Sequence, residues 1–336
     1  MHARQTTRES DARTGRVSRR RFLRSAAAGA GLVVLAGPLR GGADAADPLP
    51  TRVLGRTGAK VTVLGLGTAP IGEGPVDTPE AARIFGEVID RGVTYVDTAR
   101  SYGNAEEALA QVLPKRRDRL FLVTKLWTDS AAKADQLLGK SLATLKVDYL
   151  DLVHIHHVGG KDVAKVLADD GILPYLVKQK EAGKLRFIGL SGHARPPRFL
   201  EVLKTGRIDV VMSVMNYADR NIYGFENTVL PECRRQNVGA VAMKVYVGIK
   251  GGFKNHKKGE VGCVTAPDLL PQAMAYALDL DGVSVANVGP YTMEQAVQNV
   301  EIARRYTPLT EEQRTRLLAL GKRIAADIGP RYGPVA

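Results

Sequence analysis

The sequence predicts an α/β protein, a (β/α)8 TIM barrel with an N-terminal β-hairpin and a C-terminal extra helix. Eight short apolar runs, rich in β-branched residues and bounded by glycine or polar residues, follow one another along the chain. Amphipathic stretches separate them, and such alternation of strand and helix favours parallel pairing with right-handed crossovers. Eight units in roughly 245 residues match the usual size of a closed barrel.

The elements are expected in a fixed order. A hairpin comes first, with strands 51–54 and 60–63 around a turn at 55–58. The expected barrel strands are 61–66, 94–97, 120–125, 150–156, 187–191, 210–214, 240–244 and 283–288. The clearest amphipathic helices are 79–90, 105–113, 132–145, 196–203 and 293–304. A last helix is expected to begin at Thr310 with a capping pattern and to run to Ile328, where Gly329 and Pro330 end it.

A doubly wound dinucleotide-binding fold is the main alternative, because Gly65-Leu66-Gly67 follows a strand. The third position of that fingerprint needs a small residue for close packing of helix on strand, and Pro70 occupies it. No helix is expected before Pro79. The glycines are therefore interpreted as a tight loop after the first strand of a barrel.

The charge is concentrated at the N-terminus. Residues 1–45 contain nine arginines against three acidic residues, so almost half of the net charge of +13 lies there. The remaining basic residues are scattered and lack a repeated aromatic platform for bases. No nucleic-acid partner is expected.

The N-terminal segment has the order of an export signal. The run S-R-R-R-F-L at 18–23 is followed by a small-residue apolar run at 25–38 and by A-D-A at 43–45. The paired arginines resemble the twin-arginine signal of bacteria. The apolar run is shorter than the ~20 residues that span a bilayer, and no membrane span is expected in the mature chain. We predict a signal peptide at 1–45, a mature barrel at 46–336, and transfer by the twin-arginine export machinery to a periplasmic or other extracytoplasmic space.

Four polar residues stand where barrel enzymes carry their chemistry, at the C-terminal ends of the strands. Asp97 ends the second expected strand and Tyr102 follows in its loop, while Lys125 and His156 end the third and fourth. Each of these residues, taken alone, also fits a structural role, such as capping a helix or packing at the C-terminal end of the barrel. Together they form a proton-donating site, in which a nearby cation is expected to lower the pKa of the tyrosine.

Several motifs in order along the chain resemble the aldo-keto reductases. They are VLGRTG at 53–58, LGLGT at 64–68, VDTARSYGNAE at 96–106, TKLW at 124–127, the segment 148–156, and IGLS at 188–191. The resemblance covers residues 51–328. It implies hydride transfer between a nicotinamide cofactor and an aldehyde, a ketone or the corresponding alcohol.

The same resemblance implies a role for each of the four polar residues. Tyr102 is the general acid towards the carbonyl oxygen and Lys125 tunes it. Asp97 pairs with Lys125, and His156 orients the carbonyl group. Developing negative charge on the oxygen is then met by a donor held close to it.

The residues expected around the nicotinamide match the family less closely. Ser191 matches the serine that binds the carboxamide, whereas Gly192 stands where the family has asparagine. Met212 replaces an expected glutamine. Met243 and Lys244 replace the aromatic residue that stacks on the nicotinamide, although Met243 also suits simple core filling.

The adenosine end is expected between Gly289 and Asn299. Gln298 and Asn299 match the pair that faces the adenine. The positions that would bind a 2′-phosphate are uncharged and give no charge-assisted contacts: Tyr291, Thr292 and Gln295. NADP(H) is the cofactor that the family favours, and NAD(H) remains an alternative.

The sequence also admits three other interpretations. His154, His156 and His157 cluster in sequence, but no motif supplies a further ligand, so no metal site is predicted. A nucleotide-binding regulatory or sensor barrel without turnover is the alternative to an enzyme, and a sugar-binding module that has lost its chemistry is a third class.

An exported enzyme of this kind would also need to retain its nucleotide. The segment 246–267 is a candidate clasp that would fold over the bound cofactor.

Overall fold

The computed structural model describes residues 47–336, apart from 253–254, 256–257 and 260–261. The signal peptide predicted at 1–45 lies outside the described residues, as does its expected boundary with the barrel. Both stay predictions.

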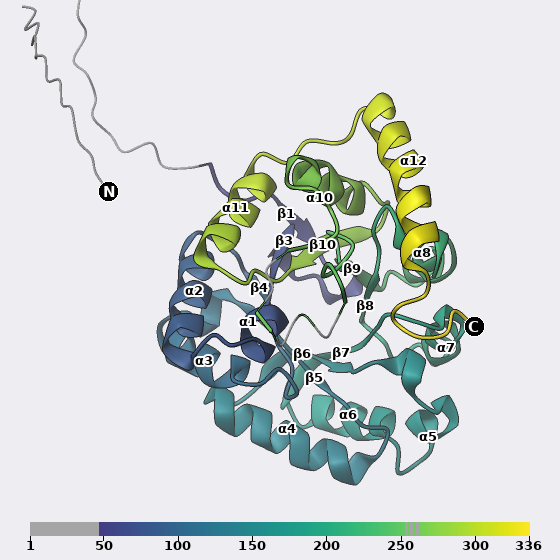
Figure 1. The fold of residues 1–336 in the computed structure, drawn as a ribbon. Coiled ribbons are helices and arrows are strands. Elements are labelled where there is room, and N and C mark those ends of the chain that lie inside the picture. The colour runs from purple at the N-terminus through teal and green to yellow at the C-terminus, as the bar shows by residue number, and fades with distance from the viewer. Residues whose placement is uncertain (1–46, 253–254, 256–257, 260–261) are drawn as a thin grey trace, which may run out of the picture. The chain divides into compact units, whose positions relative to one another are not determined.

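In the part of the chain that the structure describes, eight parallel strands close into a barrel surrounded by helices (Figure 1). The strand order is β10-β3-β4-β5-β6-β7-β8-β9. Their bounds are β3 (Leu64–Gly67), β4 (Tyr95–Asp97), β5 (Phe121–Leu126), β6 (Leu150–Ile155), β7 (Leu185–Gly192), β8 (Val210–Val214), β9 (Gly239–Met243) and β10 (Val283–Val288). The predicted TIM barrel is confirmed.

The helices surround the barrel, except for the short first helix, α1, which lies at the C-terminal ends of the strands (Figure 1). They are α1 (Ala69–Glu73), α2 (Thr78–Asp90), α3 (Ala105–Val112), α4 (Ala131–Leu145), α5 (Val163–Leu167), α6 (Ile172–Glu181), α7 (Pro196–Leu203), α8 (Phe225–Arg235), α10 (Leu270–Leu278), α11 (Met293–Arg304) and α12 (Glu311–Ile328). The extra helix α12 begins as predicted. Thr310 Oγ1 accepts a hydrogen bond from the Gln313 amide, and the Gln313 side chain accepts one from the Thr310 amide.

The N-terminal hairpin is confirmed, with β1 (Thr51–Val53) antiparallel to β2 (Lys60–Thr62). The first barrel strand begins at Leu64 rather than at residue 61, because Lys60–Thr62 is already used by the hairpin. Leu54 projects from the hairpin into the apolar cluster inside the barrel. The adjoining turn needs glycine at Gly55, which has φ +48° and whose added Cβ would lie 2.3 Å from the backbone nitrogen of Gly239.

The first loop differs from its prediction. A short helix, α1, follows β3 directly, so the expectation of no helix before Pro79 is wrong. Pro70 lies in the first turn of α1, where its missing N–H removes no helical hydrogen bond. The doubly wound alternative remains excluded because the sheet closes on itself.

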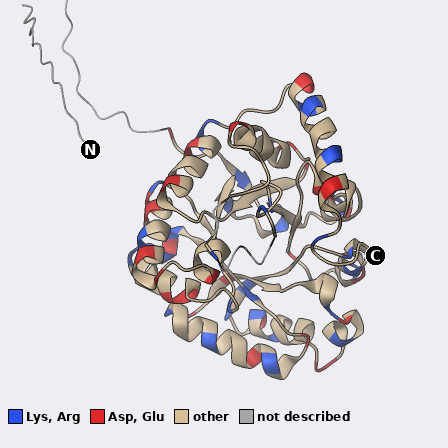
Figure 2. Ribbon diagram, viewed as in Figure 1, with Lys and Arg blue, Asp and Glu red and all other residues tan. Residues whose placement is uncertain are grey.

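Charged residues of both signs are interspersed around the outer helices, as Figure 2 shows. Among the described helices, none combines the length and apolar character that crossing a membrane requires.

Candidate active site

A cavity of about 1010 Å³ opens at the C-terminal ends of the barrel strands. Most of the residues predicted for the site line it: Asp97, Tyr102, His156, Met212, Met243, Lys244, Gly289, Gln295, Gln298 and Asn299. Lys125 lies behind this lining, and Ser191 and Gly192 are buried beside it. The structure thus brings the expected catalytic and cofactor residues to one place.

Asp97 and Lys125 form a buried ion pair at the base of the cavity. Asp97 ends β4 and Lys125 lies in β5, and Lys125 Nζ is 2.7 Å from Asp97 Oδ2. The same ammonium group donates to the carbonyl oxygen of Thr98 at 2.9 Å. Burial raises the pKa of Asp97. The charge of Lys125 and the hydrogen bond that it donates act in the opposite direction and lower that pKa. The pair is held at fixed geometry with little access to water.

Tyr102 lies beside this pair, in the loop between β4 and α3. Lys125 Nζ is 4.6 Å from the centroid of its ring. Burial raises the pKa of Tyr102 well above its ordinary value, and the charges of Asp97 and Glu73 raise it further. The expectation of a lowered pKa is therefore wrong for this structure: the ammonium group faces the ring and is engaged by other partners. Tyr102 is a protonated phenol at neutral pH.

His156 lies next to Tyr102 on the lining of the cavity. It directly follows β6 instead of ending it, and its ring centroid is 5.8 Å from that of Tyr102 with the planes nearly perpendicular. Burial lowers the pKa of His156 well below its ordinary value, and the charge of Lys125 adds to this effect. His156 is therefore neutral and carries one N–H donor, so a small polar group in the cavity beside the two rings can meet a phenol and an imidazole.

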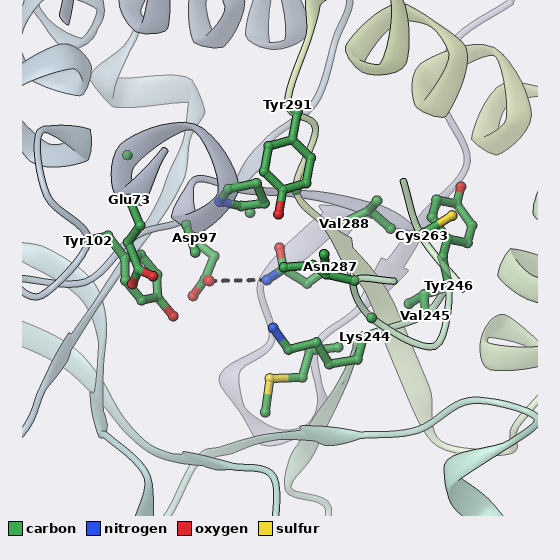
Figure 3. Close-up of a pocket in the computed structure, with 18 of the residues that line it drawn as sticks. Glu73, Asp97, Tyr102, Lys244, Val245, Tyr246, Cys263, Asn287, Val288 and Tyr291 are labelled. Atoms are coloured by element: carbon green, nitrogen blue, oxygen red, sulfur yellow. Dashed lines mark hydrogen bonds between the residues drawn. The ribbon is translucent and has the colours of Figure 1, made fainter. Parts of the chain in front are cut away.

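Asn287 also belongs to the site. It lies in β10, the last strand along the chain, which pairs with β3 and so closes the barrel. Its Nδ2 donates to Asp97 Oδ2 at 3.1 Å, as the dashed line in Figure 3 shows. Asn287 therefore binds the same carboxylate oxygen as Lys125. Asn287 is not among the residues predicted from the sequence, although a signal exists: Asn287 shares the inward face of its strand with Val285, which belongs to the interior cluster.

The opposite wall carries Met212, Met243 and Lys244. Lys244 follows β9 in the left-handed conformation with φ +57°, and its carbonyl oxygen accepts a hydrogen bond from Asn216 at 3.0 Å. Burial lowers the pKa of Lys244 to about 8, while the charge of Glu73 opposes the shift. Figure 3 shows the Lys244 side chain reaching the part of the cavity that Asn287 lines.

The buried Ser191 fits a role in binding a polar ligand group. It pairs in register with Met212, and none of the described residues hydrogen-bonds to its Oγ. A buried hydroxyl normally finds a partner. At Gly192 an added Cβ would lie 3.0 Å from Phe199, so the absence of a side chain there serves packing as well.

Hydrogen bonds join the two sides of the cavity near the residues that are expected to bind the adenosine. Tyr246 OH donates to Asn299 Oδ1 at 3.0 Å and so joins the segment after β9 to α11. Gln295 Oε1 accepts a hydrogen bond from the Tyr291 amide at 2.9 Å. These residues are all uncharged.

The C-terminal segment also contributes to the site, which the sequence analysis did not foresee. Tyr332 lines the cavity, and its backbone amide donates to Tyr223 OH at 2.7 Å. The preceding Arg331 binds both carboxylate oxygens of Asp219, at 2.9 and 2.8 Å, and the carbonyl oxygen of Val247 at 2.7 Å. The chain end is therefore anchored beside the mouth of the cavity.

The histidines do not assemble as metal ligands. Within the described ranges, no group of three or more histidine, cysteine or acidic residues has a geometry that could hold a metal ion. His154 is fully buried in β6, opposite Lys125 in the strand register.

The chain is similar to a family model, to several characterised proteins and to solved structures. The model of the aldo/keto reductase family matches residues 63–261. L-galactose dehydrogenase of Arabidopsis thaliana is 26% identical over 294 residues, which cover 79% of this chain and 91% of the relative. 6-dehydroglucose reductase of Novosphingobium aromaticivorans is 31% identical over 172 residues, which cover 44% of this chain and 54% of the relative. The solved structure of an aldo-keto reductase from Bacillus halodurans in its holo form has a TM-score of 0.65 at 26% identity, and covers 81% of this chain and 96% of its own.

Fold and site together define a barrel oxidoreductase that works with a nicotinamide cofactor. More particularly, the chain belongs to the aldo/keto reductase family and is an NAD(P)-dependent oxidoreductase.

Proposed function

We propose that the protein is an exported oxidoreductase that interconverts an aldehyde or ketone with the corresponding alcohol, with Tyr102 as the general acid and base. One observation carries the catalytic part. A protonated phenol and a neutral imidazole face the same cavity, with a buried ammonium group behind the phenol ring.

Each residue of the site has a role in the reaction at the carbonyl oxygen of the substrate. The nicotinamide, when bound, supplies or accepts the hydride. As negative charge develops on the oxygen, Tyr102 gives up its proton and His156 donates a hydrogen bond that orients the group. The Lys125 ammonium group then stabilises the phenolate that Tyr102 becomes. Asp97 holds Lys125 in place and compensates its charge in the buried site.

The cavity also offers a path for the dinucleotide. Ser191 and Met243 stand at the nicotinamide end, Lys244 supplies a cation for the phosphates, and Gln298 and Asn299 receive the adenosine. Because the adenosine end has no charged lining residue among those named, we propose that NAD(H) is accepted as well as NADP(H).

Export is the second part of the proposal. Residues 1–45 carry the paired arginines, the apolar run and the cleavage pattern of a twin-arginine signal, and the mature enzyme comprises 46–336. This route carries folded proteins, so the nucleotide is bound before export and is retained. The described ends of segment 246–267 support retention through the Tyr246–Asn299 bridge.

One experiment tests both parts. The protein is purified from the extracytoplasmic fraction, freed of unbound nucleotide by gel filtration, and denatured for mass analysis. The same preparation is assayed with NADH and NADPH against a panel of aldehydes and ketones. Bound nucleotide together with carbonyl reduction supports the proposal. Nucleotide binding without turnover of any carbonyl contradicts it in favour of a sensor.

A further inference from the structure

His154 is a buried histidine to which the proposed reaction assigns no role. It lies in β6 and is fully buried, and it shares the inward face of that strand with Leu152, which belongs to the apolar cluster inside the barrel. Neither ring nitrogen of His154 has a hydrogen-bond partner among the described residues. A buried imidazole without a partner costs free energy, so its presence here calls for an explanation.

The imidazole lies against β7, the next strand of the barrel. His154 pairs with Gly189 in the strand register, and a Cβ added at Gly189 would lie 2.3 Å from Nδ1 and 2.6 Å from Cε1 of the ring. Two residues further along the same face of β7 stands Ser191, which is 1% exposed and whose Oγ has no partner among the described residues. Diagonal neighbours on adjacent strands are within reach of a side chain of this size. Two unpartnered polar groups therefore stand side by side.

Ser191 belongs to a wall that is otherwise apolar. Of the inward-facing residues in the described strands β7, β8 and β9, Ser191 alone carries a polar side chain. The others are Phe187, Gly189, Val210, Met212, Val214, Val241 and Met243. A polar group of a ligand placed against these three strands therefore meets the Ser191 hydroxyl, with the imidazole of His154 behind it.

The charge state of His154 suits this position. Burial lowers the pKa of His154 well below its ordinary value, the charge of Lys125 lowers it further, and a contact with the Leu190 backbone opposes the shift. The imidazole is therefore neutral, with one N–H group and one lone pair. Lys125 pairs with His154 in the register from the β5 side, so its ammonium group favours the lone pair on that side and leaves the N–H for β7.

We propose that, when the nucleotide is bound, His154 Nδ1 donates a hydrogen bond to Ser191 Oγ, and the Ser191 hydroxyl donates in turn to the oxygen of the nicotinamide carboxamide. His154 is then a positioning residue, because it fixes the direction of the hydroxyl and does not itself contact the nucleotide. A hydroxyl that also accepts a hydrogen bond is the stronger donor. This inference rests on the proposed function, which assigns the nicotinamide end of the cavity to Ser191 and Met243.

A group that finds its partner only in the complex has opposite effects on stability and on binding. In the protein without nucleotide, the unpartnered imidazole is unfavourable, so His154→Leu should not lower the midpoint of thermal unfolding. In the complex, the same variant loses the hydrogen bond to Ser191, and binding should weaken. A residue with a purely structural role gives the reverse result, a lower unfolding midpoint with unchanged affinity.

Nucleotide affinity can be measured by calorimetry in the mature protein after any co-purified nucleotide has been removed. His154→Leu is expected to raise Kd for NADH or NADPH about tenfold, the scale of one hydrogen bond. Kd for ADP-ribose, which has no nicotinamide, should not change. The 3-acetylpyridine analogue of the dinucleotide keeps the carbonyl oxygen but lacks the amide N–H groups, and it should show the same tenfold effect.

Three further variants sharpen the test. Ser191→Ala should weaken binding as His154→Leu does, and the double variant should bind no more weakly than either, because both changes remove the same chain of hydrogen bonds. His154→Asn, whose amide nitrogen takes the place of Nδ1, should keep most of the affinity. Tyr95→Phe is the matched control. Tyr95 OH is also buried without a partner among the described residues, but the ring lies against Gly65 of β3, across the barrel from β7, so nucleotide affinity should not change.

The outcomes separate this inference from the proposed function. An unchanged Kd for the dinucleotide in His154→Leu, the result expected if an ordered water satisfies the imidazole, overturns the inference. An equal loss of affinity for ADP-ribose, or additive losses in the double variant, also overturns it. Carbonyl reduction that depends on Tyr102 would leave the proposed function standing in each of these cases. If Kd responds as expected but no carbonyl compound turns over, the role of His154 stands and the proposed function falls.

Discussion

The ammonium nitrogen of Lys125 lies 4.6 Å from the ring centroid of Tyr102, over the aromatic face. Two of its three N–H groups donate to Asp97 and to the Thr98 carbonyl oxygen, and the ammonium group lies against the ring of Tyr102. In the proposed mechanism, the burial that raises the pKa of Tyr102 keeps the phenol protonated until the reaction draws its proton away. The cation then stabilises the charge that spreads into the ring of the phenolate.

Removing the phenol hydroxyl tests this arrangement most directly. Tyr102→Phe is expected to lower kcat by ~10² or more, the scale of general acid catalysis, while the nucleotide affinity stays unchanged. Steady-state kinetics and a nucleotide titration measure the two effects. Tyr149→Phe serves as the control, because Tyr149 packs under Arg117 and does not line the cavity. Near-normal turnover by Tyr102→Phe would remove the proposed role.

The pH dependence follows from the raised pKa of Tyr102. Reduction requires the protonated phenol, so kcat for carbonyl reduction should stay level from about pH 6 to about pH 9, below the folded-state pKa. Oxidation requires the phenolate, so kcat for alcohol oxidation should rise steadily over the same range. His156 stays neutral there, because its pKa is lowered well below its ordinary value. A reduction rate that fell through neutral pH would show that Tyr102 ionises far earlier.

Asn287 acts through Asp97 as a positioning residue. Its amide donates to the ionised carboxylate and so lowers the pKa of Asp97, against the larger effect of burial. In Asn287→Leu the pKa of Asp97 should rise, and the acid limb of the pH–rate profile should move to higher pH. Turnover at neutral pH should fall about tenfold, the scale of a hydrogen bond to a charged group.

A purely structural role for Asn287 would give a different result. The variant would then lose stability, measured by thermal unfolding, but its acid limb would coincide with that of the unmodified protein.

The barrel could be predicted from the sequence because its strands are short, apolar and evenly separated by amphipathic helices. The largest error in a strand start arose where two elements compete for the same residues. The segment 60–63 suits a hairpin strand and a barrel strand equally well, and it forms the hairpin, whose adjoining Leu54 packs into the barrel interior. Likewise, no helix is expected from the sequence before Pro79, yet α1 forms with Pro70 in its first turn, a position that a helix accepts.

The site was predictable where neighbouring strands end in polar residues, as for Asp97 and Lys125. Two features were not predictable. The burial that fixes the pKa of Tyr102 depends on the whole packed site, and a sequence gives only the nearby cation. Tyr332 reaches the cavity because the C-terminal segment folds back over the barrel, and no local pattern carries that information.

Export can be tested by a change that preserves charge. Replacing both Arg19 and Arg20 by lysine is expected to keep the protein in the cytoplasm, because the twin-arginine pathway reads the arginine pair itself. Cell fractionation with an antibody to the barrel measures the distribution. A matched variant, Arg13→Lys with Arg16→Lys, alters two arginines of the same segment outside the motif and should be exported normally. Normal export of the Arg19 and Arg20 variant would mean that another route recognises the leader.

Retention of the nucleotide is expected to depend on the bridge between Tyr246 and Asn299. The bridge joins the segment after β9 to α11, two walls of the cavity that the dinucleotide is proposed to occupy. A nucleotide held beneath it leaves only after the bridge opens, whereas binding to an open cavity needs no such step. Tyr246→Phe should therefore raise the dissociation rate about tenfold and change the association rate little. Displacement of reduced nucleotide, followed by its fluorescence in a stopped-flow instrument, measures the rate.

The control removes a comparable hydrogen bond elsewhere. Tyr175 OH donates to Asp135 at 2.9 Å between α6 and α4, and Tyr175 does not line the cavity, so Tyr175→Phe should leave nucleotide dissociation unchanged. In protein purified after export, Tyr246→Phe should also show less bound nucleotide by mass analysis than the Tyr175 variant. Equal dissociation rates in the two variants would mean that the bridge does not limit release. An exported enzyme would then have to hold its nucleotide through contacts within the cavity, of which the Lys244 ammonium group is the principal cation.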